Sequence, residues 1–274
     1  MPHIKETLDN IVAQMSQVIL GKELQIRLIL TGLMARGHVL IEDMPGVGKT
    51  TLAHVLAHVL GLSFQRIQFT SDLLPADIIG VSVYDKAAGE FKFHQGPIFA
   101  QMVLADEINR ATPKTQSALL EAMAEHQVTV EGATRRLPAP FFVLATQNPL
   151  HQIGTFPLPE SQLDRFMMRL ELGYPNPQME RALLKGRDRR EMIADLQPTL
   201  SIKDIVAIQN AVPQVHVAGP FSLQSAIAAL YGRLIPPRWI SHTPLRPSLC
   251  INARTRLHCA GRYTKVNCAI DSQQ

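Results

Sequence analysis

The segment 43–50, Asp-Met-Pro-Gly-Val-Gly-Lys-Thr, contains the residue types that a triphosphate-binding loop requires. Gly46 and Gly48 allow backbone N–H groups to turn toward an anion. Lys49 can then reach the β- and γ-phosphates, and the hydroxyl of Thr50 can coordinate Mg²⁺. We therefore predict that nucleotide phosphates bind at the loop and the first helical turn, at Pro45, Gly46, Val47, Gly48, Lys49, Thr50 and Thr51.

The sequence on either side of this loop favours the same interpretation. The apolar run 38–42 predicts a buried strand before the loop, and apolar residues at helical spacing predict a helix that begins near Thr50. A helix N-terminus adds unpaired N–H donors and a positive dipole to an anion site. One residue departs from the usual pattern, because Asp43 stands where that pattern has a glycine six residues before the lysine.

Two adjacent carboxylates, Asp106 and Glu107, end the apolar run that begins at Met102. In a phosphate site one acid can hold the metal while another polarises a water. Consecutive residues at the end of a strand point to opposite sides, which lets these roles separate. We assign Asp106 to Mg²⁺, directly or through water, and Glu107 to general-base catalysis. The plainer alternative is a surface acid pair, and the phosphate loop disfavours it.

Two further polar residues follow apolar segments and can complete the chemistry. Asn148 ends the run that begins at Phe141 and can position the attacking water, although Asn148-Pro149 is also a common turn signal. Arg165 can stabilise phosphoryl transition-state charge, in its own subunit or in a neighbour. Its plainer alternative is a solvent-exposed ion pair with Asp164.

These residues must be positioned by a sheet. Five short apolar runs alternate with helical segments, at residues 38–42, 65–69, 101–106, 141–146 and 167–172. This alternation predicts an α/β fold, a P-loop three-layer domain with a mostly parallel five-stranded sheet and helices on both faces. Ligands bind such sheets at the carboxyl ends of the strands, where the candidate loop, acids and amide all fall.

Other segments are predicted to surround this sheet. Amphipathic patterns predict a first helix over residues 4–18 and a second over 23–35, while residues 81–93 and 127–137 read as β-hairpins. Two later helices are predicted from about 179 to 193 and from 202 to 211. We expect three parts: an α/β ATPase core over 1–173, the start of a small helical lid over 174–217, and an atypical tail over 218–274.

The bulk composition excludes some classes of protein. There is no apolar run of 18 residues and the N-terminus carries early charges, so we expect no membrane span, no secretory signal and a cytoplasmic location. Residues 1–221 hold 20 basic and 22 acidic residues, a net charge of −2, whereas residues 222–274 hold 7 basic residues and one acidic residue, a net charge of +6. The basic character belongs to the tail alone. Nucleic acid is therefore not an expected partner, because its binding needs a basic face on the folded domain.

Two sets of possible metal ligands lack the spacing of known metal sites. His54 and His58 are four residues apart on one predicted helix, but the intervening glutamate of a metalloprotease is absent. The three cysteines, Cys250, Cys259 and Cys268, lack the paired spacing of a zinc site.

Taken in order, the motifs resemble the MoxR group of AAA+ ATPases over roughly residues 1–215. The segments that carry the resemblance are Gly-Val-Gly-Lys-Thr (46–50), Phe-Thr-Ser-Asp-Leu-Leu-Pro-Ala-Asp (69–77), Gly-Pro-Ile-Phe (96–99), Ala-Asp-Glu-Ile-Asn-Arg (105–110), Gln-Ser-Ala-Leu-Leu-Glu-Ala-Met (116–123), Ala-Thr-Gln-Asn-Pro (145–149), Phe-Pro-Leu-Pro-Glu (156–160) and Leu-Asp-Arg-Phe (163–166).

The resemblance implies roles for matching positions. Lys49 and Thr50 become the Walker A pair, Asp106 and Glu107 become the Walker B pair, and Asn148 becomes sensor 1. Arg165 becomes the arginine finger that acts on the ATP of the adjacent subunit. Residues 18–23 are similar to the segment that lies against adenine, and the hairpins are similar to the helix-2 insert and the pre-sensor hairpin.

The family also implies an assembly and partners. Its members usually form a homo-oligomeric ring, most often a hexamer, which couples ATP hydrolysis to remodelling a protein client. They often work with a protein that carries a von Willebrand factor A domain, in the maturation or metal loading of other proteins.

The tail departs from this family. It lacks the lid segment Ser-Pro-Arg-Ala, whose arginine is sensor 2, and it turns basic and cysteine-containing after about residue 217. One hypothesis is a reading-frame shift that replaced the lid. Resequencing the gene tests it, since a related lid in another frame would support it and a clean frame without one would count against it.

Three other functions remain open or are disfavoured. One alternative is a hydrolysis-impaired, nucleotide-binding remnant that still docks partners. Another is a DNA-acting AAA+ ATPase, which the acidic body disfavours. A GTPase is disfavoured because the sequence has no Asn-Lys-x-Asp segment to bind guanine.

Overall fold

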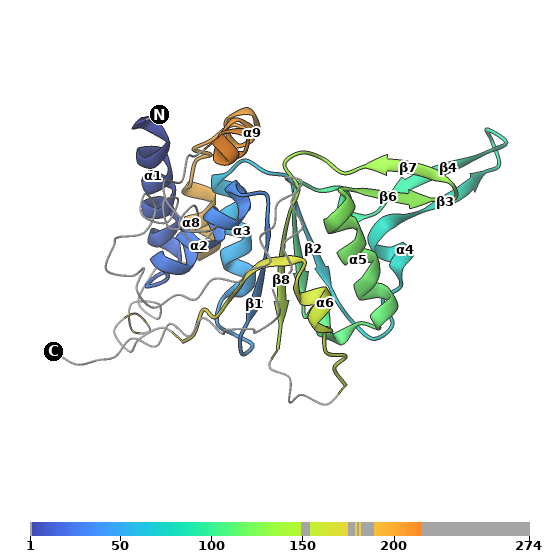
Figure 1. Cartoon of the computed structure of the whole chain (residues 1–274), viewed down its shortest axis with the longest axis horizontal. Helices are drawn as coiled ribbons and strands as arrows, with labels where there is room; N and C mark the ends of the chain where they lie inside the picture. The colour runs from blue at the N-terminus through green and yellow to red at the C-terminus, as the bar shows by residue number, and fades with distance from the viewer. Residues whose placement is uncertain (1, 149–153, 175–178, 180, 182–188, 215–274) are drawn as a thin grey trace.

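A computed structural model of the chain describes residues 2–148, 154–174, 179, 181 and 189–214 (Figure 1). The predicted tail over 218–274, its three cysteines and much of the helix predicted from about 179 lie outside the described residues.

The centre of the fold is a parallel sheet of five strands. In spatial order these are β2 (Phe64–Gln68), β5 (Met102–Asp106), β8 (Phe142–Gln147), β1 (His38–Glu42) and β9 (Phe166–Leu170). Every neighbouring pair is parallel. The predicted α/β fold class with a mostly parallel five-stranded sheet is therefore confirmed, and each strand lies within two residues of its predicted run.

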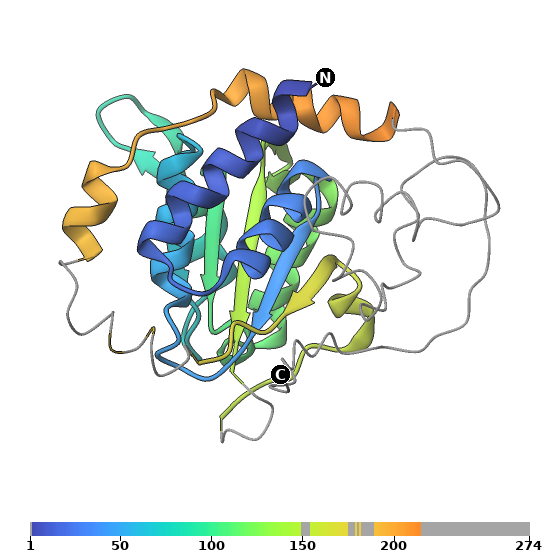
Figure 2. The same cartoon turned by 90° about the vertical axis from the view of Figure 1, so that its left-hand side faces the viewer.

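Helices cover both faces of this sheet (Figures 1 and 2). The first layer contains α1 (Pro2–Val18), α2 (Glu23–Met34) and α3 (Lys49–Val59), and the second contains α4 (Pro75–Ile79) and α5 (Pro113–Glu125). The helix predicted over 4–18 thus begins at Pro2, and the helix predicted over 23–35 ends at Met34. Short elements connect the layers: the 3₁₀ turns η1 (Pro97–Phe99), η2 (Ile108–Arg110) and η3 (Val212–Gln214), and the one-turn helix α6 (Glu160–Leu163).

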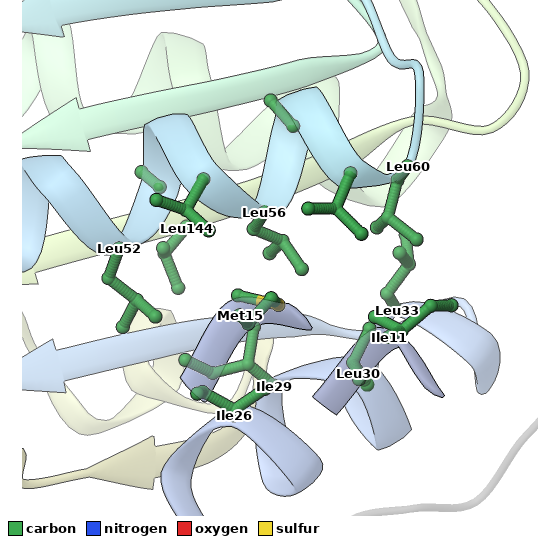
Figure 3. Packing of buried hydrophobic residues seen from close by; sticks show 14 of the residues in the cluster. Ile11, Met15, Ile26, Ile29, Leu30, Leu33, Leu52, Leu56, Leu60 and Leu144 are labelled. Atoms are coloured by element: carbon green, nitrogen blue, oxygen red, sulfur yellow. The ribbon is translucent and has the colours of Figure 1, made fainter. Parts of the chain in front are cut away.

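Successive side chains of the strands pack into two separate hydrophobic cores, one on each face of the sheet. Met102 and Leu104 of β5 pack in the core under α1–α3, whereas Val103 and Ala105 pack in the core under α5. Figure 3 shows the first core, where leucines of α3 meet residues of α1 and α2. The same period of two places Asp106, which follows Ala105, on the α3 side of the sheet.

Two hairpins project together from one end of the molecule (Figure 1). They are β3–β4 (Gly80–Asp85 with Glu90–Gln95) and β6–β7 (Gln127–Val130 with Ala133–Arg136), both antiparallel as predicted. The guanidinium carbon of Arg135 lies 3.8 Å from the ring centre of Phe93, so a cation–π contact joins the two hairpins.

The last described helices return to the first layer. Helix α8 (Arg189–Asp195) precedes α9 (Ile202–Ala211), whose Ser201 cap accepts a hydrogen bond from the N–H of Asp204. Gln209 donates to the carbonyl of Leu33 at 2.8 Å, which ties α9 to α2. The helix predicted over 202–211 is confirmed, and the boundary of a lid at residue 174 remains a prediction. Within the part of the chain that is described, no helix has the length and apolarity to cross a membrane.

Candidate nucleotide-binding site

The predicted phosphate loop connects β1 to the N-terminus of α3 at the carboxyl edge of the sheet. Gly46 and Gly48 have φ angles of 88° and 89°, in the left-handed region that favours glycine. A Cβ atom at either position would meet nothing within 4 Å. The backbone conformation, rather than crowding, therefore requires glycine here.

Lys49 is the first residue of α3 and is mostly buried, with 7% of its surface exposed. Its Nζ donates a 2.7 Å hydrogen bond to the carbonyl oxygen of Asp43. Burial lowers the pKa of the ammonium, and the carboxylates of Asp106, Asp43 and Glu107 oppose that shift. These carboxylates must lie close enough to Lys49 to act on its charge, so the lysine and the predicted acids share one site.

Asp43, the residue that replaces the usual glycine, has a structural role. Its Oδ1 accepts a hydrogen bond from the N–H of Met44 at 2.8 Å, and its Oδ2 accepts one from the N–H of Gly173 at 2.5 Å. The carboxylate thus ties the beginning of the loop to the segment that follows β9.

Asp106 ends β5 on the α3 side of the sheet, and both of its oxygens have partners. Oδ1 accepts a 2.6 Å hydrogen bond from the hydroxyl of Thr146. Oδ2 accepts two from Arg66, from Nε at 3.1 Å and from Nη2 at 2.6 Å. The side chain is only 10% exposed.

Glu107 leaves the strand with a left-handed backbone, φ 56°, and its carboxylate is held by two amides and by an ion pair with Arg110 at 3.5 Å. Oε1 accepts a 2.9 Å hydrogen bond from Asn148, and Oε2 accepts a 3.2 Å bond from Gln68. The N–H of Glu107 donates to the hydroxyl of Thr146 at 2.9 Å. The structure therefore brings together the predicted base and the predicted water-positioning residue, since Asn148 contacts Glu107 directly.

Arg165 lies elsewhere. It is exposed and immediately precedes β9, whose first residue, Phe166, is paired with His38 at the beginning of β1. The phosphate loop follows the other end of β1. Because a five-residue strand is roughly 16 Å long, Arg165 and the loop lie at opposite edges of the sheet. The structure does not bring Arg165 to the site of its own subunit.

The predicted adenine segment, residues 18–23, lies beside the loop. Nζ of Lys22 donates to the carbonyl of Leu172 at 2.6 Å and to that of Tyr174 at 3.2 Å. Burial lowers the pKa of Lys22 and the charge of Asp43 opposes this, so the segment is close to the beginning of the loop.

Comparisons with known proteins agree with this geometry. The family described as "ATPase family associated with various cellular activities (AAA)" matches residues 38–168. Protein MoxR of Methylorubrum extorquens is 34% identical over 82% of this chain and 67% of its own length. The chain belongs to the MoxR family of AAA+ ATPases. Chaperone MoxR1 of Mycobacterium tuberculosis is 47% identical over 65% of this chain and 47% of its own length.

Two further matches extend the comparison. YeaC of Bacillus subtilis, a protein without a described function, is 50% identical over 76% of this chain. The crystal structure of a proposed ATPase from Cytophaga hutchinsonii is 40% identical over 79% of this chain, with a TM-score of 0.71. The chain spans 65% of the length of YeaC and 47% of the length of MoxR1.

The residues of this MoxR-family chain fit a Mg²⁺ ion that is held jointly with phosphate. Among the described residues there is no group of three or more His, Cys, Asp or Glu able to hold a metal alone. Mg²⁺ commonly takes one or two carboxylates together with phosphate oxygens and water, rather than an all-protein cage. Asp106 offers a carboxylate, and the hydroxyl of Thr50 follows Lys49 in the first turn of α3.

Four residues that contact the two acids were given no role by the sequence analysis: Arg66, Gln68, Arg110 and Thr146. Arg66 and Gln68 are two apart in β2, a spacing that places them on one face of a strand. That alternation is visible in Gln-Arg-Ile-Gln (65–68), but the pairing of β2 with β5 is not. Thr146 belongs to the family motif Ala-Thr-Gln-Asn-Pro (145–149). The sequence does not indicate that its hydroxyl contacts Asp106 and the N–H of Glu107.

Proposed function

We propose that the protein binds ATP with Mg²⁺ and hydrolyses it to drive chaperone-like remodelling of protein clients. The observation that carries this proposal is the convergence of Lys49, Asp106 and Glu107 at one edge of a parallel sheet. The glycine loop follows β1, the two acids end β5, and β8 is paired with both strands.

Each residue has a role that its environment supports. The loop from Pro45 to Thr51 binds the phosphates through the N–H groups of residues 46–51 and through the Lys49 ammonium. Asp106 and Thr50 would hold Mg²⁺, which when bound neutralises developing phosphate charge. Glu107 accepts a proton from the attacking water, while Asn148 holds the carboxylate and orients that water.

Arg165 acts in a neighbouring subunit. Arg165 lies at the amino edge of the sheet, remote from the phosphate loop of its own subunit. Its positive charge can therefore act only on the γ-phosphate of ATP bound by an adjacent subunit. We therefore propose a homo-oligomeric ring, usually six subunits in this family. The proposed role of Arg165 therefore depends on the formation of the ring.

The biological setting is also proposed. Chaperone MoxR1 supports a chaperone-like role. The family resemblance supports a von Willebrand factor A domain partner and clients whose maturation or metal loading requires remodelling. The proposed cytoplasmic location rests on the charged, weakly apolar N-terminal sequence.

Phosphate release from ATP by the full chain is the direct test. We expect Mg²⁺-dependent turnover that falls roughly 10²-fold or more in Lys49→Ala and Glu107→Gln, because each change removes a group that acts on the transition state. Turnover in both variants equal to the unmodified protein would contradict the proposal.

A second candidate function is a nucleotide-binding remnant that docks partners and hydrolyses little. The atypical tail, in which the lid segment with sensor 2 is absent, favours it. ATP binding without turnover would distinguish this alternative. A DNA-acting ATPase has less support, since residues 1–221 carry a net charge of −2; salt-dependent DNA binding would revive it.

A further inference from the structure

Arg66 places a positive charge on the carboxylate that the proposed function assigns to Mg²⁺. Its Nε and Nη2 both donate to the same oxygen, Oδ2 of Asp106, at 3.1 and 2.6 Å. Oδ1 accepts its hydrogen bond from Thr146, which is fully buried and is itself held by the N–H of Glu107. Oδ2 is therefore the oxygen whose partner can more readily leave to admit a metal or a metal-bound water.

The ion pair is not needed to join the strands. β2 and β5 are paired along all five of their residues by backbone contacts, with Arg66 opposite Leu104 and Gln68 opposite Asp106. The Arg66 side chain instead runs along the strand to reach a diagonal neighbour at its carboxyl end. It remains 46% exposed while Asp106 is 10% exposed, so the guanidinium can move into solvent more readily than the carboxylate.

Arg66 also contacts the residues around the general base. Nη2 donates to Oε1 of Gln68 at 2.6 Å, and Nε2 of Gln68 donates to Glu107 at 3.2 Å. One chain of hydrogen bonds therefore runs from Asp106 through Arg66 and Gln68 to Glu107. A change in the partners of Asp106 can therefore alter the position of the Glu107 carboxylate through these hydrogen bonds.

We propose that Arg66 is a positioning residue that competes with Mg²⁺ for Oδ2 of Asp106, and so sets the Mg²⁺ concentration at which nucleotide is bound productively. This inference rests on the proposed function. The guanidinium keeps the buried carboxylate paired while no metal is present. A divalent ion takes over that role by displacing Arg66, because two cations repel each other at one oxygen.

The test measures binding rather than turnover. A fluorescent, non-hydrolysable ATP analogue is held at fixed concentration with the full chain, and its anisotropy is followed as Mg²⁺ is added. We expect the Mg²⁺ midpoint to be about two- to fivefold lower in Arg66→Gln than in the unmodified protein, the scale of a half-exposed ion pair. Arg66→Met keeps the length of the stem without its charge and should shift the midpoint equally.

Arg136→Gln is the matched control, because it removes one exposed arginine from the β6–β7 hairpin. Its midpoint should equal that of the unmodified protein. An unchanged or higher midpoint in either folded Arg66 variant overturns the inference, even if Mg²⁺–nucleotide binding itself is intact. No Mg²⁺-dependent nucleotide binding in the unmodified protein would instead contradict the proposed function.

Discussion

At the scale of single residues, the two acids of the site are held in different ways. Asp106 is 10% exposed and closely paired, with a guanidinium nitrogen and a hydroxyl both at 2.6 Å. Glu107 is 26% exposed; two amides donate to its oxygens, and its ion pair with Arg110 is longer, at 3.5 Å. The more exposed and more loosely paired Glu107 can meet water, which supports a base role for Glu107 and a metal-side role for Asp106.

His38 gives a prediction about pH. It is buried in β1, where its Nδ1 accepts a 3.0 Å hydrogen bond from the N–H of Val143 and its Nε2 faces the carbonyl of Met123 at 3.3 Å. Burial, with a smaller effect of nearby His126, lowers its pKa to about 4, and the bond to Met123 opposes the shift. The folded protein therefore keeps this ring neutral while the unfolded chain takes up a proton below its ordinary pKa of 6.5.

Stability should consequently fall as the pH drops from 6.5 toward 4, by about 3 kcal/mol from His38 alone. In His38→Gln, which cannot titrate, this part of the loss should disappear. Urea unfolding at several pH values in this window measures the difference. Equal losses in the two proteins would show that His38 is not the source.

The site residues that the sequence predicts belong to local motifs, whereas those that it misses depend on contacts between distant segments. Lys49 and Thr50 follow from a local motif, and Asp106 and Glu107 follow from a local apolar run. The contact of Arg66 with Asp106 joins residues 40 positions apart. It depends on which strands are neighbours, and local periodicity does not contain that information.

At the scale of elements, α3 is both the end of the phosphate loop and the centre of the first core. Its leucines, among them Leu56, pack on α1 and α2 (Figure 3). The order of strands was not predicted, because alternation along the chain fixes the sheet type but not the sequence of neighbours. The five sheet strands and the helices α1, α2, α3 and α9 were predicted from apolar patterns, whereas α4, α5 and α6 were given no bounds.

Leu56→Ala should lower the free energy of unfolding by about 2–5 kcal/mol, because Leu56 is fully buried and its loss leaves a cavity. Chemical denaturation measures this change. Leu74→Ala is the control: Leu74 is 61% exposed, and we expect a change within about 0.5 kcal/mol. Similar losses for both leucines would contradict the described core.

At the scale of the whole molecule, the opposite placement of the loop and Arg165 makes a prediction about assembly. Arg165→Ala should lose roughly 10³-fold in turnover, the scale of an arginine finger, while still binding ATP. Mixing Arg165→Ala with Lys49→Ala should restore activity at about a quarter of randomly formed subunit contacts, where an intact loop meets an intact arginine. Absence of recovery, in a mixture shown to form mixed oligomers, would contradict action between subunits.

The most direct test of the central claim compares ATP binding and ATP turnover in the same preparations of three proteins. If Lys49 binds phosphate and Glu107 activates water, Lys49→Ala should lose both binding and turnover. Glu107→Gln, in contrast, should bind ATP as tightly as the unmodified protein and lose turnover by roughly 10²-fold or more. Glu107→Gln with undiminished Mg²⁺-dependent turnover would contradict the account.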